Sequence, residues 1–336
     1  MTALVLHKLL AIFITVGIGW FAGRMRWLGE PTGGSDPARL LGNAAFFIFV
    51  PALLFRTTAR LDLHHMPWAT LAAFFVPVIA TMLLVYAAGH WRARGHRPSD
   101  LLAGERAAAR PAARAIAVVF GNSVQIGIPL AAALFGEAGL GIHITLVSLH
   151  ALILLTLITA LVELDLARAR ARHAGAAGLW HTLGSTVRNT LVHPVVLPVL
   201  AGMAWNLSGL SLPGPVDETL ALLGTAVAPL CLVLIGISLA YTAVGGALRA
   251  AVGITLLKLL LLPAAVLVVA YWGFGLRGVP LSVVVTMAAL PSGSNALIFA
   301  QRYAAHEAET TAAIVLSTLG FVLTAPLWLA LLAALA

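Results

Sequence analysis

Apolar segments long enough to cross a membrane recur along the whole of this 336-residue chain, and they constrain its fold more than any other feature. A helix of about 20 apolar residues spans the hydrocarbon core of a bilayer. Hydrophobic residues make up 61% of the positions and charged residues only 10%, whereas a soluble domain carries about 25% charged residues. The sequence therefore predicts an all-α polytopic membrane protein without a sizeable soluble domain.

Ten membrane spans are expected from the lengths of these segments and from their flanks. The first apolar run is too long for the core of a signal peptide and lacks a small-residue cleavage site, so we expect it to be retained as a span. Tryptophans near several segment ends fit the aromatic belt of a membrane interface. The expected spans are residues 4–23, 38–57, 67–91, 112–135, 138–162, 190–208, 217–241, 249–274, 279–303 and 308–334.

The basic residues orient the expected bundle. With the N-terminus outside, the inner loops carry fifteen arginines and the outer loops carry three, Arg56, Arg60 and Arg277. This asymmetry follows the positive-inside rule, so both termini are expected outside. The formal net charge of +8 is then a topology signal, and no nucleic-acid partner is expected.

A polar, basic stretch over residues 164–189 divides the expected spans into two sets of five. Because each set holds an odd number of spans, the second set enters the membrane from the opposite side. Two such sets form the inverted repeat on which many secondary transporters are built. We therefore predict a first five-helix repeat over residues 1–163, a cytoplasmic linker over residues 164–189 and a second repeat over residues 190–336.

Helix-breaking residues interrupt the fourth span of each half. The first half reads GNSVQIGIP over residues 121–129, and the second reads PSGSN over residues 291–295. Proline removes a backbone donor and glycine weakens a helix, so both spans are expected to be broken at membrane depth and to cross near its centre. Unwound backbone at that depth must be buried in protein or line a wet cavity. Since half-helix N-termini attract anions, we favour a binding site for a small anion over a pair of packing kinks.

One basic residue, Lys258, lies deep inside an apolar stretch, about 13 Å of helix rise beyond Arg249. None of the twelve acidic residues lies in the interior of a span, where it would neutralise this lysine. An intramembrane charge is by default a functional hypothesis. Lys258 is then a coupling group or a counter-charge for an anionic substrate. The alternative is that it bonds backbone carbonyls at a broken helix and steadies the bundle.

Three other polar residues lie within the expected spans, and each has either a functional role or a role in helix packing. His150 lies midway along the fifth span and is either a proton carrier or a packing histidine. Asn43 and Ser238 occupy equivalent places in the second and seventh spans. Each of these two residues faces the substrate site or serves helix packing, and the sequence leaves both options open.

Several functional classes are disfavoured by what the sequence lacks. It has neither the paired intramembrane acids nor the HExxH motif of a membrane-embedded hydrolase, and no phosphate-binding GxxxxGK[ST] loop. The single cysteine, Cys231, excludes an intrachain disulfide and a cysteine-based metal site. We therefore expect no enzyme activity, no metal and no cofactor. A sodium-coupled symporter of the bile-acid-transporter type remains an alternative, as does a channel or a receptor that does not transport.

Four stretches of the chain, GNSVQIGIPLAAALFGEAGL, APLCLVLIGISLA, KLLLLP and ALPSGSNALIFAQRY, resemble the auxin efflux carrier family. This family includes the plant PIN-FORMED auxin carriers and bacterial relatives described as malonate transporters. The resemblance covers essentially all ten spans. It implies two inverted five-helix repeats, elevator-like alternating access, a homodimer in a bacterial inner membrane, and transport of an organic anion without ATP.

The resemblance also implies roles for particular residues. The fourth and ninth helices would cross at Pro129 and Pro291. The polar lining of the site would comprise Asn122, Gln125, Ser292, Ser294 and Asn295. The central loop is too short to carry the phosphorylation sites of the plant carriers. The third span lacks the acidic residue of the plant members, which leaves the coupling mechanism open.

Overall fold

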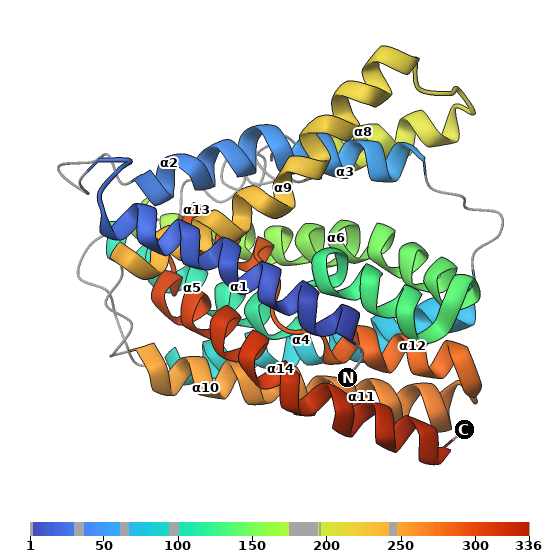
Figure 1. Ribbon diagram of the computed structural model, residues 1–336. Helices are drawn as coiled ribbons and strands as arrows, with labels where there is room; N and C mark the ends of the chain where they lie inside the picture. Colours follow the sequence, from blue (N-terminus) through green and yellow to red (C-terminus); the bar gives the residue numbers. More distant parts are fainter. Residues whose placement is uncertain are drawn as a thin grey trace.

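The computed structural model describes residues 3–29, 37–60, 67–93, 101–174, 194, 196–241 and 247–335. Within these ranges the regular elements are helices, and the one β interaction is an isolated bridge. Figure 1 shows the helices gathered into a single bundle. The predicted all-α class is therefore confirmed.

The first half of the chain forms long helices that are interrupted at a few points. Helix α1 is followed by a continuous helical segment made of α2, the π-helix η1 and α3. The elements are α1 (Ala3–Arg24), α2 (Pro37–Ala44), η1 (Ala45–Phe49), α3 (Val50–Ala59), α4 (Trp68–Ala93), α5 (Leu101–Val119), the π-helix η2 (Ser123–Gly127) and α6 (Ile128–Ala174).

The second half repeats this mixture of long and interrupted helices. Two further π-helices, η5 and η6, lie in the segment that begins with α10. The elements are α8 (Val196–Leu207), α9 (Gly214–Tyr241), α10 (Leu248–Leu256), η5 (Leu257–Leu261), α11 (Leu262–Val268), η6 (Val269–Gly273), α12 (Gly278–Ala289), α13 (Asn295–Arg302) and α14 (Glu307–Leu335).

Six helical segments of the described part of the chain are long and apolar enough to cross a membrane. They are Pro37–Ala59, Trp68–Ala93, Leu130–Arg170, Gly214–Ser238, Leu248–Gly273 and Glu307–Leu335. Two shorter apolar helices, Val196–Leu207 and Gly278–Ala289, accompany them. These segments fit a multi-pass membrane protein, while the count of ten spans stays a prediction.

Helix α6 consists of two segments that fold back on one another at Gly136 (Figure 1). The backbone at Gly136 has φ 62° and ψ −159°, a conformation open to glycine but strained for a residue with a Cβ. His143, in the second segment, contacts the backbone of Ser123 just before the first. In a straight helix these two residues would lie about 30 Å apart, so the contact requires the reversal.

The predicted linker begins inside a helix. The second segment of α6 continues to Ala174, so residues 164–174 are helical. Residues 175–193 lie outside the described part of the chain.

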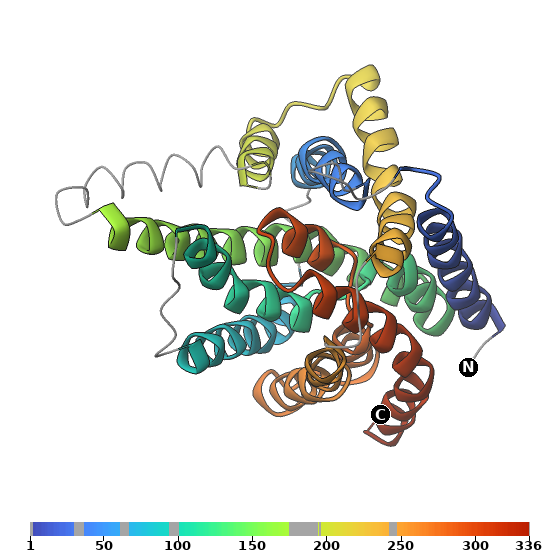
Figure 2. The ribbon, with the colours of Figure 1, turned by 90° about the vertical axis from the view of Figure 1, so that its left-hand side faces the viewer.

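The helices pack so that the two interrupted regions of the chain lie in the core of the bundle. Helix α1 packs along α9, α3 packs against α8 and α9, α4 packs against α5, and α10 packs along α14. Figure 2 shows α5, α6 and α13 enclosed between the group formed by α3 and α9 and the group formed by α10 and α14. Side chains around Val119 and Leu290 are buried, so both interrupted helices reach the core.

Candidate functional site

The two helix breaks meet in the core and hydrogen-bond to each other. Helix α5 ends at Val119, and helix α12 ends at Ala289. Between each of these ends and the next helix, the chain is extended, and Gly121 pairs with Ser292 in an antiparallel bridge. The amide of Asn122 donates to the carbonyl of Pro291 (2.8 Å), and the amide of Gly293 donates to the carbonyl of Phe120 (2.8 Å). Each break thereby satisfies buried backbone groups of the other.

The position of the first break differs from the prediction. Residues 120–122 are non-helical, whereas Ser123–Gly127 is wound as a π-helix and Pro129 is the second residue of α6. Pro129 is therefore not the crossover residue; Gly121 crosses Ser292. The reason is that the antiparallel pairing with Ser292 holds the chain extended at Gly121, whereas residues 123–128 are already helical when the chain reaches Pro129. The second break, at Leu290–Ser294, includes Pro291 as predicted.

Gly293 allows the two breaks to approach closely. A Cβ atom at this position would lie 2.8 Å from the carbonyl oxygen of Gly121 and 3.0 Å from its carbonyl carbon. Both are backbone atoms that cannot rotate away. The close approach of the two breaks therefore requires glycine at position 293. This requirement is separate from the tendency of glycine to interrupt a helix.

Hydrogen bonds to three other elements hold the second break in place. Lys258 of η5 donates from Nζ to the carbonyl of Ala288 (2.9 Å), in the last turn of α12. The Oγ of Ser317, in α14, accepts a hydrogen bond from the amide of Ser292 (3.0 Å). The Oγ of Ser292 in turn donates a hydrogen bond to the carbonyl of Ala117 in α5 (2.8 Å). A cation is favourable at a helix C-terminus, where carbonyls lack helical partners. Lys258, only 1% exposed, therefore meets the negative end of a half-helix.

Two histidines of α6 fix the first break. His150 Nε2 accepts the amide of Gly121 (3.2 Å), and His143 Nε2 lies 2.9 Å from the carbonyl of Ser123. Because Nε2 of His150 is an acceptor, the proton of the neutral ring is assigned to Nδ1. This Nδ1 is buried and has no hydrogen-bond partner among the described residues. The His150 ring packs on Phe120 with centroids 4.6 Å apart.

A cavity of about 300 Å³ borders both breaks. Its walls come from α3, the start of α9 and the second segment of α6, and its floor comes from residues 120–124 and 293–295. The Asn295 Oδ1 is buried without a partner within the described residues. The polar or charged lining residues are Arg56, Thr57, Asn122, Ser123, His150, Thr225, Ser294 and Asn295. The cavity therefore offers a small polar floor beneath largely apolar walls.

The structure brings together some of the predicted site residues and separates others. Asn122, His150, Ser294 and Asn295 line the cavity, whereas Pro291 and Ser292 lie in the crossing beneath it. Lys258 is adjacent to the crossing but does not line the cavity. Asn43 is exposed, and Ser238 accepts a hydrogen bond from Gln301 (3.2 Å). The side chains of Gln125 and Pro129 lie outside the described part of the structure.

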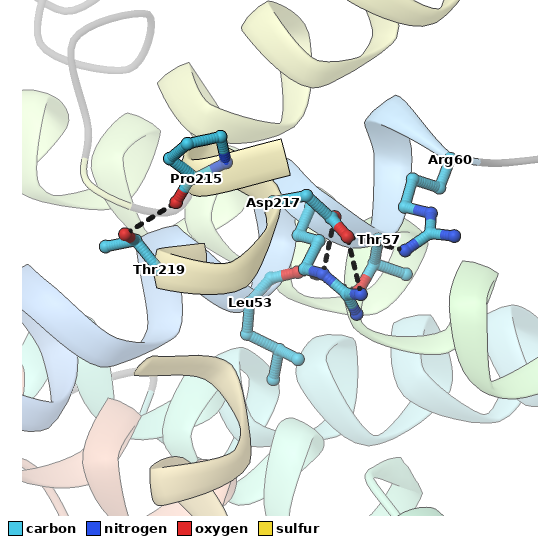
Figure 3. A network of polar contacts seen from close by, with 7 residues as sticks. Leu53, Thr57, Arg60, Pro215, Asp217 and Thr219 are labelled. Carbon is cyan, nitrogen blue, oxygen red and sulfur yellow. Dashed lines mark hydrogen bonds and ion pairs between the residues drawn. The ribbon is translucent and has the colours of Figure 1, made fainter. Parts of the chain in front are cut away.

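One charged group at the cavity was missed from the sequence, where Arg56 counted only as a loop charge. Arg56 lies in α3 and lines the cavity. Its Nε and Nη2 donate to the two carboxylate oxygens of Asp217 (2.8 and 3.2 Å), and Arg60 Nη1 donates to the same carboxylate (2.9 Å) (Figure 3). Arg56 and Arg60 are four residues apart, so they share one helix face. In the sequence, the signal for this role is a pair of arginines four residues apart at the end of an apolar segment.

A second polar cluster lies away from the cavity. Asp165, which is buried in α6, accepts a hydrogen bond from the Tyr86 hydroxyl (2.6 Å) and lies 2.8 Å from His90 Nε2. Arg168 lies 3.4 Å from the same carboxylate. The cluster ties the end of α4 to α6.

Comparisons with known proteins match almost the entire chain to one family. A family model described as membrane transport protein matches residues 4–329. The chain is 27% identical over 329 residues to a protein called uncharacterized transporter YfdV from Escherichia coli strain K12, covering 96% of this chain and 95% of that one. The same values hold for the YfdV proteins of Escherichia coli O157:H7 and Shigella flexneri. With the crossed breaks and the resemblance noted from its motifs, the chain belongs to the membrane transport protein family, that of the auxin efflux carriers.

Proposed function

We propose that this chain is a secondary transporter that moves a small organic anion, a carboxylate, across the bacterial inner membrane. The observation that carries the proposal is the lining of the cavity. Residues 122–124, at the start of η2, and residues 293–295, at the start of α13, border the same space of about 300 Å³. Two helix N-termini thus meet at one cavity in the core of a membrane protein.

The chemistry of this cavity supports an anion as the substrate. Helix N-termini carry partial positive charge, and their amides bind carboxylates. His150 lines the cavity, and its Nδ1, which is assigned the proton, has no partner among the described residues, so we propose it as a further donor to the anion. The lining contains no aspartate or glutamate among the described residues, so a cation would find no carboxylate there. Asn122, Ser294 and Asn295 are proposed as substrate contacts, together with Gln125 and with Ser292 of the adjacent crossing.

The proposed mechanism is alternating access of the elevator type in a homodimer. The two breaks are bonded to each other, so the four helices that they join, α5, α6, α12 and α13, would move as one body past the remainder of the bundle. The chain would form two inverted five-helix repeats, residues 1–163 and 190–336, with both termini outside. His150 would carry protons or serve as a neutral donor.

Lys258 is proposed to hold the end of α12 in place during this movement. Its ammonium is bonded to the carbonyl of Ala288, and it does not line the cavity. The alternative role, a coupling group or counter-charge that responds to the substrate, is tested by the pH dependence of transport.

Counterflow in proteoliposomes tests the proposed function. Vesicles loaded with an unlabelled carboxylate should accumulate the labelled acid transiently, because a carrier exchanges its substrate while a channel only equilibrates it. A thermal-shift screen of mono- and dicarboxylates selects the acid to be used. Absence of both binding and counterflow for every acid of the panel would contradict the proposal.

Ion gradients distinguish the coupled forms of this transporter. If uptake requires a sodium gradient and ignores a proton gradient, the protein is the sodium-coupled symporter of the alternative hypothesis. Uptake that follows neither gradient identifies a uniporter. Empty vesicles and vesicles with heat-denatured protein give the background.

A further inference from the structure

We infer that Arg56 is the cationic group that receives the carboxylate of the transported anion, and that Asp217 is the carboxylate that this anion replaces. The inference rests on the proposed function, because it names a contact of the same cavity. It assigns the fixed positive charge of the site to α3, where the sequence had suggested Lys258.

Arg56 is placed where an anion in the cavity would meet it. Among the described residues that line the cavity, Arg56 is the one lysine or arginine. The ammonium of Lys258 is buried beneath the crossing and bonded to the carbonyl of Ala288. An anion in the cavity therefore meets the guanidinium of Arg56 and not the ammonium of Lys258.

The geometry of the Arg56–Asp217 ion pair is suited to an exchange of carboxylates. Arg56 uses Nε and Nη2 to hold both oxygens of Asp217, which is the paired arrangement in which arginine recognises any carboxylate. The third nitrogen, Nη1, has no hydrogen-bond partner among the described residues. The carboxylate of an incoming anion can thus approach Arg56 at Nη1 before it takes over the nitrogens held by Asp217.

The charges around Asp217 also favour such an exchange. Two arginines, Arg56 and Arg60, share this single carboxylate, which leaves one positive charge in excess (Figure 3). The side chains of Arg56 and Asp217 are 33% and 26% exposed, and ion pairs with such access to solvent are weak. When an anion takes Arg56, Arg60 still neutralises Asp217. The exchange therefore leaves no carboxylate without a cation.

The apolar walls narrow the class of anion. Leu53, Leu54, Phe120, Val147 and Val227 line the cavity beside Arg56. One guanidinium binds one carboxylate, and the apolar side chains of the walls favour an anion whose remaining part is apolar. We therefore expect a monocarboxylate such as benzoate or hexanoate to bind more tightly than malonate, which would place a second carboxylate against apolar side chains.

Isothermal titration of the purified full-length protein tests this assignment, with benzoate, malonate and the uncharged benzamide as probes. Arg56→Gln should weaken benzoate binding roughly tenfold or more, the usual loss for a hydrogen-bonded charge. Asp217→Asn should instead strengthen it several-fold, since Arg56 is then released. Arg39→Gln is the matched control, because Arg39 also pairs with a carboxylate, that of Glu307, and does not line the cavity. It should change benzoate affinity by no more than about threefold.

The opposite signs expected for Arg56→Gln and Asp217→Asn separate recognition from a structural role. If the pair merely joins α3 to α9, both variants lower the thermal midpoint and neither alters the preference for benzoate over benzamide. Parental benzoate affinity in Arg56→Gln, or weakened affinity in Asp217→Asn, overturns the inference, as does tighter binding of malonate than of benzoate. Should Arg56→Gln fail to fold, Arg56→Lys replaces it and should bind benzoate more weakly than the parental protein because the paired contact is lost. A parental protein that binds no carboxylate at all contradicts the proposed function itself.

Discussion

The two helix breaks are alike in their crossing but differ in what holds them. The first break is bonded by the imidazoles of His143 and His150, and it contains no proline. The second contains Pro291 and is bonded by Lys258 and Ser317, neither of which lines the cavity. One break is thus fixed in part by a residue that lines the cavity, His150, and the other by two residues that do not.

This difference separates polar groups that maintain the fold from those left for a ligand. Lys258 and Ser317 have their partners within the protein. By contrast, the Nδ1 of His150 and the Oδ1 of Asn295 have none among the described residues, and both residues line the cavity. Buried polar atoms without partners are costly, so these two atoms of cavity-lining residues are available to a ligand or a water molecule.

The crossing itself should be the most sensitive place to substitution. Gly293→Val would place side-chain atoms against the backbone of Gly121 and should cost about 3 kcal/mol of stability. Gly253→Ala is the control, because a Cβ there meets no atom within 4 Å. Thermal unfolding in detergent measures both variants. Equal midpoints for Gly293→Val and the parental protein would show that the breaks do not approach so closely.

Lys258→Met should destabilise the protein by about 2 kcal/mol, because a charged hydrogen bond to the end of α12 is lost. The folded fraction should keep the parental substrate affinity and the parental pH profile of uptake, since Lys258 lies outside the cavity lining. If a stably folded Lys258→Met variant lost the pH dependence of uptake, Lys258 would be a coupling group. The second break would then also carry a residue that acts in transport.

Asn295→Ala should weaken substrate binding about fivefold without unfolding the protein, which is the typical effect of one neutral hydrogen bond. Asn122→Ala is expected to act in the same direction. Asn206→Ala provides the comparison, since Asn206 lies on α8 and bonds the carbonyl of Ala59 outside the cavity. Parental transport rates in both site variants would remove these asparagines from the site.

Ser238→Ala should have the smallest effect on binding, within about twofold of the parental affinity. The Ser238 hydroxyl already accepts a hydrogen bond from Gln301 and does not line the cavity. A modest loss of thermal stability is expected, because the Gln301 amide loses its acceptor. A large loss of affinity would show that the cavity extends to Ser238 in another conformation.

The sequence predicted the helical class and both helix breaks because these depend on local properties. Apolar length indicates spans, and residues such as Pro291 and Gly293 disfavour helix wherever they occur. The exact place of the first break was not predictable in the same way. Gly121, Gly127 and Pro129 all weaken a helix, and only the pairing with Ser292 selects Gly121.

The role of Arg56 could not be predicted because it depends on contacts between distant segments. Its partner, Asp217, is 161 residues away in the chain. From the sequence alone both residues looked like charges at span ends. Lys258 was conspicuous by its apolar neighbours, yet its partner is a backbone carbonyl, which every residue possesses and no pattern reveals.

The mutual bonding of the two breaks has a consequence for how the protein is made. The amide of Asn122 and the carbonyl of Phe120 pair with Pro291 and Gly293, which leave the ribosome long after them. Until then these groups lack their final partners in an environment where unpaired backbone is costly. The amino-terminal half therefore cannot reach its final form while synthesis is incomplete. A chain that stops before residue 291 should be left with an open core and become a substrate for membrane quality control.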